Sequence, residues 1–224
     1  MGLQIQGNGG VIAEVDGTTF RAQRATPRPV DHGALGAYCI GMRSGIIGAA
    51  IAANSEIFQF RWSDATRYCV IRKIMIAASV TTTFFAAGVP MQLDLIKATG
   101  WTVAGSGGTR ATPAALLKRR TSMGSTLVAA SDIGISSTAA LTAGTKTLET
   151  LALSNVVAAC PITASLNGTI IAPGTILWQA EVGDGEHPLV LVQNEGFVIT
   201  VPAVPATGTW TVSVTVDWAE VTAY

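Results

Sequence analysis

Charged residues are scarce in this chain. Asp, Glu, Lys and Arg make up 12% of its 224 residues, whereas about 25% is usual for a soluble domain. The 14 basic and 14 acidic side chains cancel, so the formal net charge is zero. Proteins that bind nucleic acid through phosphate contacts normally carry an excess of positive charge. The composition therefore disfavours nucleic acid as a partner and favours a subunit whose surface is largely covered by neighbours.

Long apolar runs are missing as well. The longest segment without a charged residue, residues 150–180, is interrupted by Asn, Pro and Gly. It does not approach the roughly 18 continuous apolar residues that predict a membrane-spanning helix. The N-terminal MGLQIQGNGG lacks the basic and apolar regions of a signal peptide. We therefore expect no membrane partner.

Cysteine and histidine are too few and too scattered for the common metal and catalytic sites. Cys39, Cys69 and Cys160 form no CxxC pair, so we expect free thiols rather than a zinc site or a disulfide framework. Asp184 and Glu186 could ligate Ca²⁺, but Gly-Asp-Gly-Glu is also an ordinary turn. No P-loop or GxSxG motif is present in its required context. The sequence predicts no cofactor, no metal and no enzymatic activity.

What the chain does contain is period-two alternation. In residues 209–218 the apolar side chains, from Trp210 to Trp218, alternate with Thr, Ser and Asp, as expected for a strand with one buried face. Similar segments separated by Gly, Pro and Asn recur at residues 35–41, 56–62, 68–80, 91–101, 145–153, 175–182, 187–193 and 197–201. They predict an all-β, antiparallel β-sandwich of jelly-roll type. We expect the last strand to pair with residues 197–201 and to end near Trp218, since Glu220 takes the next apolar position.

Two segments differ from the strand pattern. Thr112 as N-cap and Pro113 at the first helical position predict one short helix with basic residues near its end. Residues 1–34 are Gly-punctuated, then basic, and too poor in apolar residues to form a core. They predict an extended N-terminal arm ahead of a single domain, residues 35–224. The basic residues of the arm and helix are the candidate assembly interface: Arg21, Arg24, Arg28, Lys118, Arg119 and Arg120.

Five blocks of the sequence resemble virion structural proteins of tailed bacteriophages. They are EIFQFRWSDATR (residues 56–67), RRTSMGSTLV (119–128), TAALTAGTKTL (138–148), GEHPLVLVQNEGFVI (185–199) and ATGTWTVSVTVDWAEVTAY (206–224). The likeness extends over residues 35–224 and includes no catalytic signature. It implies a place in the particle, as a capsid decoration protein or as a head–tail or tail component, and it brings no site residues with it.

Together these features predict a non-enzymatic structural subunit of a tailed-phage virion, assembled in the host cytoplasm. We expect a capsid-associated decoration or cement protein that forms a homo-oligomer such as a trimer and binds the major capsid protein or another virion protein. One alternative is a receptor-binding or fibre-head module that recognises host glycans through exposed Trp residues. A second is a glycan-degrading enzyme, which needs two acidic residues facing each other across a groove.

Overall fold

The computed structural model describes residues 15–16, 22–23, 36–48, 51–82, 85, 90–112, 118–160, 168–180, 187–203, 207–222 and 224. The chain divides into two units, Met1–Asp31 and His32–Tyr224. In the first unit, β1 (Val15–Asp16) and β2 (Ala22–Gln23) form an antiparallel pair with Val15 opposite Gln23. The division falls close to residue 34, where the sequence predicts that the arm ends.

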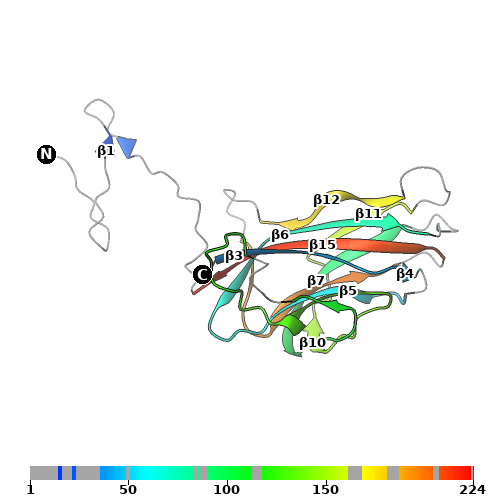
Figure 1. The fold of residues 1–224 in the computed structure, drawn as a ribbon, viewed down its shortest axis with the longest axis horizontal. Helices are drawn as coiled ribbons and strands as arrows, with labels where there is room; N and C mark the ends of the chain where they lie inside the picture. The colour runs from blue at the N-terminus through cyan, green and yellow to red at the C-terminus, as the bar shows by residue number, and fades with distance from the viewer. Residues whose placement is uncertain are drawn as a thin grey trace. The chain divides into compact units, whose positions relative to one another are not determined.

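The second unit consists of two antiparallel sheets packed on each other (Figure 1). In the first sheet the order is β12, β6, β15, β3, with β13 also beside β6 and β4 beside β15. Its strands are β3 (Gly36–Arg43), β4 (Ile47–Gly48), β6 (Tyr68–Val80), β12 (Thr169–Gln179), β13 (Leu189–Leu191) and β15 (Thr209–Val221).

In the second sheet the order is β10, β7, β14, β5, β9, β8, with β11 also beside β7. Its strands are β5 (Ser55–Trp62), β7 (Met91–Val103), β8 (Thr109–Arg110), β9 (Ile133–Ile135), β10 (Thr145–Leu148), β11 (Ser154–Ala158) and β14 (Glu195–Val201). The predicted all-β sandwich is confirmed.

The pairing of the eight main strands gives the fold its topology. Four strands from the first half of the chain pair with four from the second half, as β3 with β15, β5 with β14, β6 with β12 and β7 with β11. Along the chain, each of these eight strands is followed by a strand of the other sheet, except that β7 and β11 lie in the same sheet. This is the strand order of a jelly roll, in which a long antiparallel ribbon is rolled into two four-stranded sheets.

Aromatic side chains link the two sheets in the core. Trp218 of β15 stacks on Tyr38 of the same sheet, with 5.7 Å between ring centroids, and meets Phe60 of the other sheet edge-on at 5.4 Å. Phe60 in turn stacks on Phe197 at 5.2 Å. All four side chains are buried, and each such side chain contributes roughly 1.5–3 kcal/mol to folding.

The partner and the end of β15 differ from the prediction. β15 pairs with β6 and β3, whereas residues 197–201 belong to β14 in the other sheet. Alternation identifies a buried face but not a partner, and β14 and β15 each present an apolar face to the same core. The strand also continues to Val221, because the buried Glu220 finds hydrogen-bond donors there.

The predicted helix is wrong at its C-terminal end. Residues 113–117 lie outside the described residues, but Lys118 forms an antiparallel bridge with Tyr38, and the backbone N–H of Arg119 donates to Ala37 O at 3.0 Å. Pairing with the edge of β3 therefore replaces the helical hydrogen bonds that the local sequence favours. In the described part of the chain, the one helix is a single 3₁₀ turn, Ala130–Asp132.

Candidate functional site

The long connection between β7 and β11 runs over residues 104–153. Its described residues 118–119 and 133–135 lie along β3 and β5, whereas its last strand, β10, pairs with β7 at the other edge of the second sheet. Its strand β9 pairs with β5, with Ile135 opposite Phe58, and its residues 118–119 pair with β3. The edge of β5 and the Ala37–Tyr38 end of the β3 edge are thus occupied within the chain, which removes a common route to unwanted strand pairing there. We call this segment the β7–β11 connection.

A buried ion pair holds the β7–β11 connection to β5. Lys146 Nζ lies 2.8 Å from Glu56 Oε2, and the two side chains are only 2% and 8% exposed. Gln59 Nε2 also donates to Glu56 Oε2, at 2.6 Å. Lys146 Nζ lies 4.3 Å from the centroid of the Trp101 ring, a cation–π contact. Burial lowers the pKa of Lys146, and the hydrogen bond to Glu56 opposes that shift.

Two arginines belong to the same polar region: Arg61 forms an ion pair with Asp132, and Arg110 contacts Gln59. Arg61 Nη1 lies 3.5 Å from Asp132 Oδ1, and Ser63 Oγ donates to Asp132 Oδ2 at 2.5 Å. Arg110 Nη1 donates to Gln59 Oε1 at 3.3 Å. Within the described residues, Arg61 Nε and Arg110 Nη2 are buried without a hydrogen-bond partner. Because these two nitrogen atoms are buried without a hydrogen bond, they lower the stability of the fold.

A second buried carboxylate holds the β7–β11 connection at the end of β15. Thr126 Oγ1 donates to Glu220 Oε1 at 2.5 Å, and the backbone N–H of Leu127 donates to the same oxygen at 3.1 Å. Trp218 Nε1 donates to Glu220 Oε1 at 3.3 Å. Burial raises the pKa of Glu220, and these hydrogen bonds oppose the shift. Glu220 also contributes to raising the pKa of Tyr38 to about 12, although burial is the main cause.

The candidate assembly residues fall into two groups. Arg21, Arg24 and Arg28 lie outside the described residues. In the second group, Arg119 is half exposed and forms an ion pair with Asp217 of β15, Arg120 is exposed, and Lys118 is partly exposed. The structure thus brings Lys118, Arg119 and Arg120 together on the edge of β3.

The thiols are protected rather than reactive. Cys39, Cys69 and Cys160 are all free, as the sequence predicts. Burial is the main cause of a raised pKa in each case, and it brings the pKa of Cys39 to about 11. Since the thiolate is the reactive form, none of the three has the character of a nucleophile.

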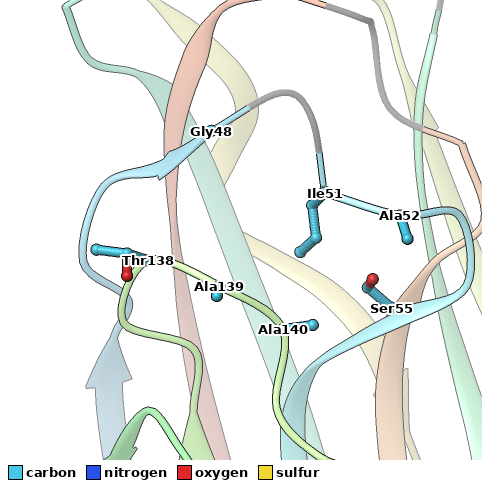
Figure 2. Close-up of a pocket in the computed structure, with 7 residues that line it drawn as sticks. All are labelled: Gly48, Ile51, Ala52, Ser55, Thr138, Ala139 and Ala140. Atoms are coloured by element: carbon cyan, nitrogen blue, oxygen red, sulfur yellow. The ribbon is translucent and has the colours of Figure 1, made fainter.

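A shallow hollow lies between the β4–β5 turn and residues 138–140 (Figure 2). Its lining is made of small or apolar residues: Gly48, Ile51, Ala52, Ser55, Thr138, Ala139 and Ala140. None of these is ionisable, so they offer no general acid or base. Across the described residues, no group of three or more His, Cys, Asp or Glu side chains could hold a metal ion. The described residues also contain no helix long and apolar enough to cross a membrane.

On another side of the sandwich, at the upper border of Figure 1, β11 and β12 lie next to each other. Among the described strands, β11 pairs only with β7 and β12 only with β6. The two strands are joined by Ser154 Oγ, which donates to Leu177 O at 2.5 Å. Four large apolar side chains in or next to these two strands are exposed, namely Leu151 (79% exposed), Leu153 (45%), Val157 (57%) and Ile176 (50%). Val157 lies opposite Gln92 on the outer face of the second sheet, and Ile176 lies opposite Met75 on the outer face of the first sheet. We call residues 151–158 and β12 together the β11–β12 side, and exposed apolar side chains are common at interaction sites.

Sequence reasoning missed Glu56 and Lys146 altogether and misread Glu220. A signal was present, because a charged residue inside an otherwise apolar strand is expected only where a partner satisfies it. Glu56 and Glu220 both occupy such positions. Their partners could not have been predicted, since Lys146 and Thr126 lie 90 and 94 residues away along the chain.

Comparisons with protein-family models, with curated proteins and with solved structures gave no match to this chain.

Proposed function

We propose that this protein is a non-enzymatic structural subunit of a tailed-phage virion, a capsid-associated decoration or cement protein that self-assembles and stabilises the particle. Its partners would be further copies of itself and the major capsid protein or another virion protein. The virion would be its final location, reached after assembly in the host cytoplasm.

The observation that carries this proposal is the β11–β12 side. Four large apolar side chains in or next to β11 and β12 are exposed, which is costly for a solitary molecule and useful for one that is covered in an assembly. The low charge content and zero net charge agree with such a covered surface. The jelly roll occurs in viral capsid domains, but lectins and cupins share it. The fold is therefore compatible with the proposal and does not distinguish it from other functions of jelly-roll proteins.

The test is the protein content of purified particles. We expect mass spectrometry of density-gradient-purified virions to find this chain in many copies per particle and to find it depleted from the soluble fraction of the lysate. Its absence from purified virions would contradict the proposal. Binding of the isolated protein to host glycans, together with that absence, would favour the receptor-binding alternative.

A further inference from the structure

Three buried side chains bring an amine, a carboxamide and a carboxylate together inside the sandwich. Lys146 of β10 carries the amine, and Gln59 and Glu56 of β5 carry the other two groups. Lys146 Nζ lies 2.8 Å from Glu56 Oε2, and Gln59 Nε2 lies 2.6 Å from the same oxygen atom. Both distances are within the reach of a group that transfers protons. Glu56 can therefore exchange protons with both nitrogen atoms.

The carboxamide of Gln59 is fully buried and is fixed at both ends. Its Nε2 donates to Glu56 and also to Thr142 O, at 2.8 Å. Its Oε1 accepts a hydrogen bond from Arg110 Nη1 at 3.3 Å. A cation beside a carbonyl oxygen stabilises the negative charge that develops there when a nucleophile attacks the carbonyl carbon. The nitrogen of the carboxamide thus faces a carboxylate, and its oxygen faces a guanidinium group.

The amine of Lys146 is kept away from water. Its side chain is 2% exposed, and the centroid of the Trp101 ring lies 4.3 Å from Nζ. Burial lowers the pKa of Lys146, while the hydrogen bond to Glu56 opposes the shift, because an ammonium group that loses its hydration gives up a proton more readily. The neutral amine that results is the nucleophilic form of lysine.

We propose that Lys146 and Gln59 join in an intramolecular isopeptide bond, an amide between two side chains, with Glu56 as the proton carrier. Glu56 first accepts a proton from Lys146 Nζ. The Nζ lone pair attacks Gln59 Cδ, and the carbonyl electrons move onto Oε1 beside Arg110. Glu56 passes its proton to Nε2, the Cδ–Nε2 bond breaks and its electron pair leaves with ammonia. Glu56 then takes the surplus proton from Nζ, so the products are one amide and one ammonia.

The bond would tie the β7–β11 connection to the interior of the second sheet. β10 and β5 are separated in that sheet by β7 and β14, so no hydrogen-bonded ladder joins them directly. A covalent link between residues this far apart in the sequence restricts the unfolded chain, as a disulfide does. The reaction needs no oxidant, metal or second copy. The inference therefore goes beyond the proposed function and does not depend on it.

The first experiment measures the intact mass of the purified full-length protein after prolonged incubation at neutral pH. We expect wild type to be lighter than its sequence mass by one ammonia molecule. Digestion with trypsin and a second protease, followed by tandem mass spectrometry, should yield a branched peptide that joins Gln59 to Lys146. Wild type at its full sequence mass, or ammonia loss without that branched peptide, would overturn the inference. Neither result requires a variant to fold.

The second experiment compares variants that keep the local charge or the reacting groups. Lys146→Arg retains a cation next to Glu56 but has no lysine amine, and Glu56→Gln retains the amine and the carboxamide but has no proton carrier. We expect both to keep the full sequence mass. Lys97→Arg is the matched control, because Lys97 forms an ion pair on the surface, and it should still lose ammonia.

The same variants separate the bond from other reactions. A succinimide at Asn167-Gly168 would release the same mass, but Lys146→Arg would not prevent it. Ammonia loss that persists in Lys146→Arg would therefore overturn the bond, and loss that persists in Glu56→Gln would overturn the role of Glu56. Lys146→Met removes the ion pair and the bond alike, so a loss of stability in that variant does not distinguish them and the mass does.

Discussion

Glu220 connects the end of β15 to the β7–β11 connection through a single carboxylate. Its position belongs to the apolar face of the strand, and it is fully buried. Thr126, Leu127 and Trp218 donate hydrogen bonds to it, which is what makes a buried carboxylate tolerable. At the scale of the residue, the side chain that breaks the sequence pattern is the one that fixes a loop to the core.

The raised pKa of Glu220 predicts a pH-dependent stability. In the unfolded chain the group titrates near its ordinary value of 4.5, whereas in the folded protein its pKa is higher. Its contribution to stability is complete below the unfolded pKa and is lost as the pH rises through the folded pKa. We expect the free energy of unfolding of wild type to fall relative to Glu220→Gln as the pH rises from about 4 to 8. Urea titrations across this range measure the difference, and a difference that stays constant with pH would refute the assignment.

Removing the cation of the buried Glu56–Lys146 pair should cost much stability, and removing the carboxylate as well should recover part of that loss. Lys146→Met leaves a buried carboxylate without its cation and should cost about 3–5 kcal/mol. Adding Glu56→Gln to that variant should restore part of the loss, because the unpaired charge is then removed. A double-mutant cycle by chemical denaturation measures both effects.

The surface pair of Lys97 and Glu149 provides the control for that cycle. Its side chains are about a third and a half exposed, so Lys97→Met should cost less than about 1 kcal/mol. Equal costs for Lys97→Met and Lys146→Met would show that the buried pair has no special role in holding the β7–β11 connection.

At the scale of the element, β14 depends on a close approach that only glycine allows. A Cβ atom at Gly196 would lie 2.2 Å from Phe60 O and 2.9 Å from Trp101 Cε3. Gly196→Ala must therefore displace β5 or Trp101, and we expect it to cost about 2–3 kcal/mol.

Gly48 of β4 is the matched control for this substitution. A Cβ atom there has no heavy atom within 4 Å, so Gly48→Ala should change stability by less than about 1 kcal/mol. Thermal unfolding of the two variants tests the contrast, and similar melting temperatures would contradict the packing of Trp101 over β14.

Strand alternation in the sequence predicted most of the elements but not their neighbours. The buried faces of β5, β7 and β15 could be predicted, because side chains alternate across a sheet. The separation of β14 and β15 into different sheets could not, since both strands present apolar faces to the same core. Nor could the pairing of Lys118 with β3, where a long-range contact outweighs a local helix signal.

At the scale of the whole molecule, the two units should contribute differently to assembly. Residues 1–31 form a unit separate from the sandwich, so their deletion should leave the melting temperature of the sandwich within a few degrees of wild type. We expect the same deletion to weaken attachment to the particle, measured as the amount of protein that co-sediments with virions. Unfolding of the truncated protein would contradict this division of roles.

A symmetric reconstruction of purified virions tests the central claim most directly. The account predicts jelly-roll density on the particle surface for each copy, with the exposed apolar side chains of the β11–β12 side covered by a neighbouring subunit. Virions in which no density fits this sandwich, and whose proteins do not include this chain, would contradict the claim that it is a structural subunit of the particle.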